Sequence, residues 1–142
     1  MINVGVIGYG YWGPNIVRNF SSLEGAQVQS VCDMNQQSLN RVRKVYPHIQ
    51  TTQDCGDILN APNIDAVAVI TPVSTHYELA KRALLNGKHV FVEKPFTATI
   101  AQAEDLIMKV PGVQYTTTVI GYSMLSQVTN TYSAFFFVTL KN

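Results

Sequence analysis

Apolar and polar positions follow two alternating periods over the first 110 residues. Short, almost continuous apolar runs are typical of buried parallel strands, and apolar residues every three or four positions predict amphipathic helices. The expected strands are 2–7, 28–32, 49–52, 66–70 and 88–92, and the expected helices follow Gly13, cover 36–45, open at Asp54, cover 75–85 and open near Thr99. This alternation predicts an α/β fold, a Rossmann-type doubly wound parallel sheet.

A glycine-rich segment, Gly8-Tyr9-Gly10-Tyr11-Trp12-Gly13, directly follows the first expected strand. In a strand-loop-helix unit, the first glycine permits a tight turn, the second lets a phosphate approach bare backbone, and the third lets the helix pack closely. The amides at the start of the helix then face the anion. A glycine turn without a ligand would explain the same residues, but the flanking strand and helix favour a dinucleotide site. We predict that Gly8, Gly10, Tyr11, Trp12 and Gly13 bind the cofactor.

Asp33 ends the second expected strand and lies twenty residues beyond Gly13. This is the separation of the acid that accepts hydrogen bonds from the adenosine ribose diol. A carboxylate there also repels a 2′-phosphate, and the following residues, 34–36, offer no guanidinium to bind one. We therefore expect NAD rather than NADP. Asp33 as a cap for the following helix is the structural alternative, and both roles are compatible.

Two later strand ends carry polar residues and a specific sequence signature. Thr71, Pro72, Thr75 and His76 follow one strand, and Glu93-Lys94-Pro95 follows the next. Together with segments 83–84 and 87–92, these residues resemble the Gfo/Idh/MocA family, named for glucose–fructose oxidoreductase, inositol dehydrogenase and a rhizopine catabolism protein. Segments 11–15 and 18–20 are similar to a branch of that family that oxidises nucleotide sugars at carbon 3.

The resemblance implies an enzyme that moves a hydride between a sugar or nucleotide-sugar carbon and NAD. It implies Lys94 as the catalytic residue, because an ammonium stabilises charge on the reacting oxygen. It also implies that Glu93, Lys94, Thr71, Pro72, Thr75 and His76 contact the cofactor. An exposed Glu93–Lys94 loop pair and an ordinary threonine helix start are the structural alternatives.

Composition limits the partners. The formal charge is +1 and the cations are scattered, so neither nucleic acid nor an anionic membrane surface is expected. No basic leader and no apolar stretch of roughly twenty residues is present, which makes the cytoplasm the expected compartment. Cys32 and Cys55 belong to no metal-binding pattern, so we expect no metal.

Composition changes abruptly after residue 109. All nine acids and nine of the ten Lys and Arg residues precede this point, and 110–140 contains no charged residue and no histidine. We expect an NAD-binding domain over 1–120, in which 113–120 forms a sixth strand of the sheet, and an atypical tail over 121–142. The tail reads as a truncated or frame-shifted remnant, an added strand with disordered residues, or a partner-binding or membrane-touching segment, in that order of preference.

The resemblance implies a second domain that holds the substrate and forms the usual oligomer interface, and we expect this chain to lack it. The oligomeric state therefore stays open. A standalone NAD-binding or sensing module without catalysis is the alternative function. A methyltransferase that binds S-adenosylmethionine shares the glycine turn and the strand-end acid, but it has no use for Lys94.

Overall fold

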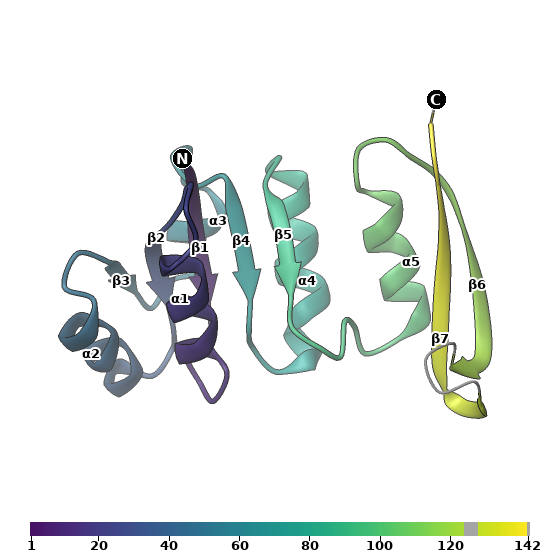
Figure 1. The fold of residues 1–142 in the computed structure, drawn as a ribbon, viewed down its shortest axis with the longest axis horizontal. Helices are drawn as coiled ribbons and strands as arrows, with labels where there is room; N and C mark the ends of the chain where they lie inside the picture. The colour runs from purple at the N-terminus through teal and green to yellow at the C-terminus, as the bar shows by residue number, and fades with distance from the viewer. Residues whose placement is uncertain (124–127, 142) are drawn as a thin grey trace. The chain divides into compact units, whose positions relative to one another are not determined.

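The apolar runs form a parallel sheet. The computed structural model describes residues 1–123 and 128–141, and the chain divides into two compact units, Met1–Ala98 and Thr99–Asn142. The first unit contains five parallel strands in the order β3-β2-β1-β4-β5 (Figure 1): Gln50–Thr52, Ala26–Cys32, Ile2–Ile7, Ala66–Val69 and His89–Val92. Its helices are α1 (Gly13–Ser21), α2 (Gln36–Val45), α3 (Gly56–Leu59) and α4 (Val73–Leu85). The predicted Rossmann-type α/β fold is confirmed.

The sheet separates two cores. Alternate residues of each central strand belong to one core or the other, because successive side chains of a strand point to opposite faces. On one face, α1 and α2 pack through Val17 and Leu39 against strand residues that include Val6. On the other face, α3 and α4 pack against strand residues that include Ile7 and Val67. Both faces are therefore covered by helices, as a doubly wound parallel sheet requires.

Strand register brings the carboxyl ends of the strands to one edge. Ile7, the last residue of β1, pairs with Cys32 of β2 and with Val69 of β4. Val69 in turn pairs with Val92, the last residue of β5. The segments that follow these four strands therefore leave the sheet side by side, at the edge where ligands bind in open α/β sheets.

Helix ends agree with the expected ones in part. α2 covers the predicted residues, and Asn35, not Asp33, is its N-cap, because the Asn35 side chain accepts a hydrogen bond from the Gln37 amide. The alternative role of Asp33 as the helix cap is therefore wrong. α4 begins two residues before the expected start, and at its end Gly87 adopts a φ of 71°, which glycine tolerates at a helix C-terminus.

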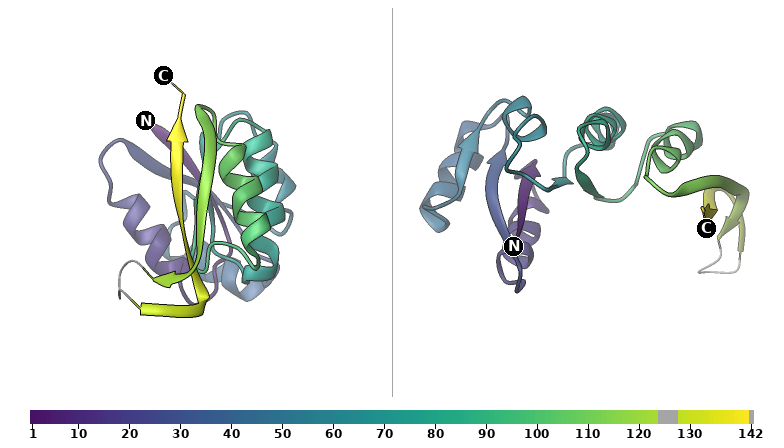
Figure 2. Two further views of the ribbon diagram at one scale, coloured as in Figure 1. Left: turned by 90° about the vertical axis from the view of Figure 1, so that its right-hand side faces the viewer. Right: turned by 90° about the horizontal axis from the view of Figure 1, so that it is seen from above.

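The second unit consists of α5 (Ile100–Met108) and two antiparallel strands, β6 (Val113–Ser123) and β7 (Val128–Leu140). The strands run side by side as a separate two-stranded sheet (Figure 2). The prediction that 113–120 joins the parallel sheet is wrong, because β7 supplies the pairing partner. Threonine and aromatic residues favour this second strand, of which only an apolar run at 135–138 was expected. The predicted tail over 121–142 includes residues 124–127 and 142, which lie outside the described part.

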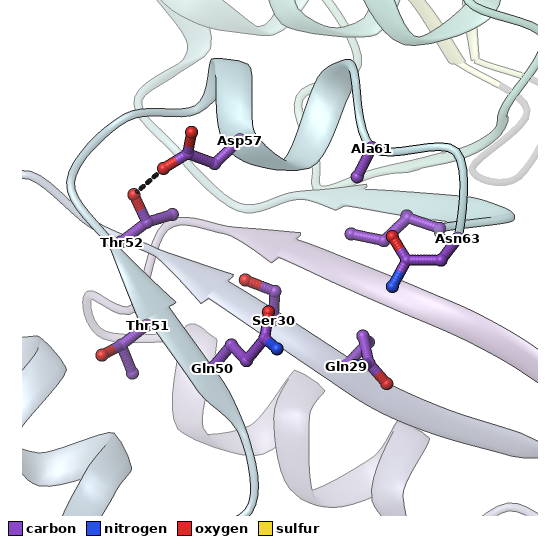
Figure 3. A pocket seen from close by; sticks show the side chains of 9 residues that line it. Gln29, Ser30, Gln50, Thr51, Thr52, Asp57, Ala61 and Asn63 are labelled. Atoms are coloured by element: carbon purple, nitrogen blue, oxygen red, sulfur yellow. Dashed lines mark hydrogen bonds between the residues drawn. The ribbon is translucent and has the colours of Figure 1, made fainter.

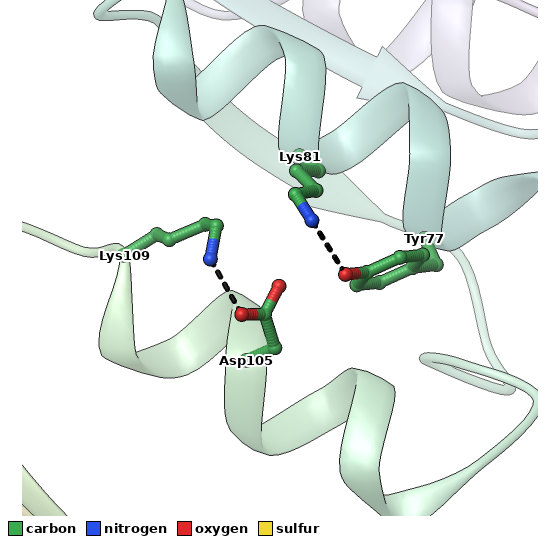
Figure 4. A network of polar contacts seen from close by, with 4 residues as sticks. All are labelled: Tyr77, Lys81, Asp105 and Lys109. Atoms are coloured by element: carbon green, nitrogen blue, oxygen red, sulfur yellow. Dashed lines mark hydrogen bonds and ion pairs between the residues drawn. The ribbon is translucent and has the colours of Figure 1, made fainter.

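Figure 4 shows two lysines, each in a polar contact with the residue four positions earlier in the chain. In α4, Lys81 Nζ donates to the Tyr77 hydroxyl over 2.8 Å. At the end of α5, the C-cap residue Lys109 donates through Nζ to Asp105 Oδ1 over 2.5 Å. Thr99 caps the start of α5 by accepting a hydrogen bond from the Gln102 amide, as expected for a helix that opens at Thr99. The two lysine contacts stabilise their helices by about 0.2–0.5 kcal/mol each, and the Thr99 cap by about 0.5–2 kcal/mol.

Candidate functional site

The glycine loop lies directly after β1, and its three glycines meet different surroundings. Gly8 has a φ of 102°, and a Cβ there would lie 2.5 Å from the Ile70 carbonyl oxygen. A Cβ on Gly13 would lie 2.7 Å from the Gly8 carbonyl oxygen. A Cβ on Gly10 would meet nothing within 4 Å. The fold itself thus excludes side chains at Gly8 and Gly13, whereas Gly10 faces open space that a phosphate group can enter.

Tyr11 and Trp12 expose their rings beside this loop. Tyr11 is 87% exposed and Trp12 is 45% exposed, and their rings meet edge to face with centroids 5.3 Å apart. Lys94 Nζ lies 5.8 Å from the centroid of the Trp12 ring, within the range of a cation–π contact. The structure therefore brings the predicted catalytic lysine to the glycine loop.

Asp33 is tied to the same loop through its carboxylate. The Tyr9 amide donates to Asp33 Oδ2 over 2.6 Å, and the Asn35 amide donates to Asp33 Oδ1 over 2.7 Å. A carboxylate offers about four acceptor positions, so two remain for the hydroxyls of a ribose. Asp33 thus fixes the glycine loop and keeps the capacity to bind a diol.

Tyr9 was not among the predicted site residues, although it stands between the first two glycines. Its ring is buried in the core shared by α1 and α2. Burial raises the pKa of its hydroxyl, with a smaller contribution from Tyr46. The sequence signal for this anchor is a large aromatic residue at a loop position that would otherwise be exposed.

The segment after β4 forms a small hydroxyl cluster. Thr75 Oγ1 lies 2.7 Å from Thr71 Oγ1 and 2.8 Å from the Pro72 carbonyl oxygen. Neither threonine is the N-cap of α4, since Pro72 occupies that position without a side-chain cap. The alternative of an ordinary threonine cap is therefore wrong, and the hydroxyls lie at the carboxyl edge of the sheet.

His76 is buried inside α4. It is 1% exposed, and both ring nitrogens face backbone carbonyl oxygens. Nε2 lies 2.7 Å from the oxygen of Thr71, and Nδ1 lies 2.9 Å from the oxygen of Pro95. His76 thus joins the loops after β4 and β5, which both contribute predicted site residues.

Lys94 is exposed, and its peptide bond to Pro95 is cis. The Glu93 amide donates to the Val69 carbonyl oxygen over 3.0 Å, which fixes the backbone before Lys94. Within the described residues no ion pair joins Glu93 to Lys94, and the ammonium faces Trp12 instead. Sequence reasoning on the Glu-Lys-Pro segment did not identify this aromatic partner, because the two residues are far apart in the chain.

A cavity of about 270 Å³ lies elsewhere, beside α3 (Figure 3). Thr52 Oγ1 donates to Asp57 Oδ2 over 2.5 Å at one side of it. Its lining is mostly polar and uncharged, and it shares no residue with the predicted site: Gln29, Ser30, Gln50, Thr51, Thr52, Asp57, Ala61, Asn63 and Ile64. The predicted site lies at the carboxyl edge of the sheet, where Tyr11, Thr75 and Lys94 are exposed and His76 is buried.

The two cysteines have no predicted chemical role at this edge of the sheet. Cys32 is buried, and burial raises the pKa of its thiol to about 12. In residues 1–123 and 128–141, no group of three His, Cys, Asp or Glu side chains could hold a metal ion. In the same described part, no helix is both long enough and apolar enough to cross a membrane.

Comparison with known proteins gives a family and several relatives. Residues 2–120 match the Gfo/Idh/MocA model, described as an oxidoreductase family with an NAD-binding Rossmann fold. The Escherichia coli K12 oxidoreductase YdgJ is 37% identical over 105 residues, which are 74% of this chain and 30% of YdgJ. Glycosyl hydrolase family 109 protein 2 of Shewanella sp. strain ANA-3 is 36% identical over 115 residues, which are 75% of this chain and 25% of the relative.

Solved structures agree with these relatives. The crystal structure of apo scyllo-inositol dehydrogenase from Lactobacillus casei has a TM-score of 0.71 and 27% identity, and the match covers 78% of this chain and 33% of that one. This chain spans about a quarter to a third of the length of the relatives that it matches. The predicted family and the predicted cofactor, NAD, are confirmed by the family match.

Proposed function

The chain belongs to the Gfo/Idh/MocA family of oxidoreductases, and on that premise we propose that it is the cofactor-binding part of an NAD-dependent sugar or nucleotide-sugar dehydrogenase. The observation that carries the proposal is the position of Lys94. Its ammonium lies against Trp12 of the glycine loop, at the edge where the strands end. A lysine in this position can reach both a substrate hydroxyl and the cofactor.

The residues present fit a dinucleotide. Gly10 faces open space, and the first turn of α1 contains no acidic residue that would repel a phosphate. The amides at the start of α1 would therefore face the pyrophosphate. Asp33 would accept hydrogen bonds from the ribose hydroxyls and would repel a 2′-phosphate, which favours NAD over NADP. Thr71, Pro72 and Thr75 would contact the cofactor from the segment after β4.

Lys94 would act on the substrate oxygen. When bound, NAD accepts or returns the hydride. The Lys94 ammonium would stabilise the negative charge that develops on the alcohol oxygen, and it would supply the hydroxyl proton when the sugar is reduced; when the sugar is oxidised, the neutral amine would accept that proton. The contact with Trp12 is worth only about 0.5–1 kcal/mol at an exposed site, so the Lys94 side chain can adjust toward a bound substrate at small cost.

A titration of the purified chain with NAD, NADP and S-adenosylmethionine tests the cofactor part of the proposal. Trp12 is the only tryptophan, so its fluorescence reports on the glycine loop directly. We expect a saturable change with NAD and a much weaker one with the other two ligands. A folded chain that does not bind NAD, or that binds NADP as tightly as NAD, contradicts the proposal.

A second candidate function is glycoside cleavage, favoured by the relatives named glycosyl hydrolase family 109 proteins. Net formation of NADH from a sugar would support the dehydrogenase, whereas release of a sugar without net NADH would support cleavage. A standalone NAD-binding module would show neither reaction. Because this chain spans a minor part of its relatives, these assays should also include a longer relative whose cofactor part carries the same residues.

A further inference from the structure

His76 occupies a position between the two loops that follow β4 and β5. Its ring is 1% exposed, so it has no free edge for a cofactor. Its nitrogens lie 2.7 Å from the Thr71 carbonyl oxygen and 2.9 Å from the Pro95 carbonyl oxygen. We propose that His76 is a positioning residue that fixes the Lys94 turn against the segment after β4, in place of the cofactor contact expected from the sequence. Its consequence for catalysis rests on the proposed function.

The backbone of Lys94 is held on both sides by these contacts. On the side before it, the Glu93 amide donates to the Val69 carbonyl oxygen over 3.0 Å, which ties this segment to the end of β4. On the side after it, the Pro95 carbonyl faces His76 Nδ1. Loss of the second contact would remove the hydrogen bond that ties Pro95 to α4. The ammonium would then spend less time against Trp12.

The chemistry of the two acceptors explains why a histidine suits this position. Both partners are carbonyl oxygens, which only accept hydrogen bonds, and the two nitrogens of an imidazole point in different directions. A neutral ring donates to one carbonyl at a time, and a doubly protonated ring donates to both. An asparagine amide nitrogen approximates the position of Nδ1, whereas a glutamine amide nitrogen approximates that of Nε2. The two amides therefore separate the contact with Pro95 from the contact with Thr71.

The test measures Trp12 emission in the chain without NAD, because a positive charge over an indole ring shifts its fluorescence. The Lys94→Met variant gives the reference spectrum for loss of the ammonium. Variants His76→Asn, His76→Gln and His76→Ala are compared with it, and Glu78→Gln is the control, because Glu78 is an exposed residue of the same helix. Far-UV circular dichroism checks that each variant is folded.

We expect His76→Asn to keep most of the wild-type emission, because it can still donate to Pro95. We expect His76→Gln and His76→Ala to move most of the way to the Lys94→Met spectrum, and the double variant of His76→Gln with Lys94→Met to show no further shift. Equal spectra for the Asn and Gln variants, or additive shifts in the double variant, overturn the proposal. If the alanine variant does not fold, the Asn and Gln pair decides.

This experiment separates failure of the positioning role from failure of the proposed function. It uses no cofactor, so the Asn and Gln difference stands even if the wild-type chain binds no NAD, which would contradict only the proposed function. Conversely, NAD binding without that difference would contradict only the role of His76. A merely structural histidine would lower the melting temperature in all three variants without distinguishing Asn from Gln in the Trp12 signal.

Discussion

Gly8 and Gly10 stand two residues apart in the same loop, yet the structure predicts opposite effects of one added methyl group. At Gly8, a Cβ would lie 2.5 Å from the carbonyl oxygen of Ile70 and 2.7 Å from its carbon. Both are backbone atoms of the neighbouring strand end and cannot rotate away. The φ of 102° adds a second obstacle, since residues with a Cβ rarely adopt it.

The cost of Gly8→Ala follows from these two terms. A residue forced into an unfavourable positive-φ conformation costs about 1–3 kcal/mol, and overpacking of a filled position costs about 1–3 kcal/mol more. A total of about 2–6 kcal/mol is a large share of a typical domain stability of about 5–15 kcal/mol. With a shift of roughly 4 °C per kcal/mol for a domain of this size, the melting temperature should fall by at least about 8 °C.

Gly10→Ala should leave the fold intact. Its Cβ would enter open space, and its φ lies outside the left-handed range. Replacing a glycine by alanine at a compatible position stabilises by about 0.4–1 kcal/mol, because the unfolded chain loses freedom. The methyl group would, however, occupy the space through which a phosphate approaches the backbone. We expect NAD affinity to fall at least about tenfold, which corresponds to about 1.4 kcal/mol.

Thermal denaturation followed by circular dichroism and calorimetric titration with NAD measure the two effects separately. The expected pattern is a destabilised Gly8→Ala variant and a stable Gly10→Ala variant with weak NAD binding. If Gly10→Ala binds NAD as tightly as the wild-type chain, the open space beside Gly10 is not the phosphate site. If the two variants lose stability equally, the difference in their surroundings does not control the loop.

Three further predictions concern the remaining charged and thiol groups. Asp33→Ala should weaken NAD binding and narrow the preference over NADP, measured by titration with both, and an unchanged ratio of the two affinities would contradict it. Burial raises the pKa of Cys32 to about 12, above the ordinary 9.0, so native Cys32 should resist a disulfide reagent at neutral pH while Cys55 reacts. The unfolded thiol loses its proton at lower pH than the buried one, so the stability contributed by Cys32 should decline above about pH 9. Rapid modification of native Cys32 would refute this. A melting temperature that falls above pH 9 no more than that of a Cys32→Ala variant would refute it too. Lys88→Met should cost about 2–3 kcal/mol, because two carbonyl acceptors lose a charged donor, while the exposed Lys44→Met control should stay near the wild-type stability, and equal melting temperatures would contradict it.

Sequence periodicity predicted the parallel sheet well because β1, β4 and β5 are mainly apolar runs between amphipathic helices, although the short edge strand β3 is polar. The register that aligns Ile7, Cys32, Val69 and Val92 follows from the fold class, so the edge that gathers the candidate residues was predictable too. The contact between Lys94 and Trp12 was not, because no local pattern encodes which loop an exposed lysine faces.

The pairing partner of β6 could not be predicted from the local sequence either. An apolar, threonine-rich stretch predicts a strand but does not identify its partner. The sequence predicts residues 113–120 as the sixth strand of the parallel sheet, whereas their antiparallel partner, β7, comes from the next segment of the chain. Nearby segments often pair in this way, since a hairpin requires only a short connection between its strands.

The two lysines of segment 87–95 illustrate how structure assigns roles that a motif leaves open. Lys88 is 7% exposed, and its ammonium donates to the carbonyl oxygens of Ala61 over 2.6 Å and Ile64 over 2.8 Å. A cation held in this way is unavailable to a ligand, and its loss should lower NAD affinity only at temperatures where the variant begins to unfold. Lys94 is exposed and contacts an aromatic ring that it can leave at small cost. Lys94 is therefore the lysine that is available for chemistry at the sheet edge, and Lys88 stabilises the loop 61–64.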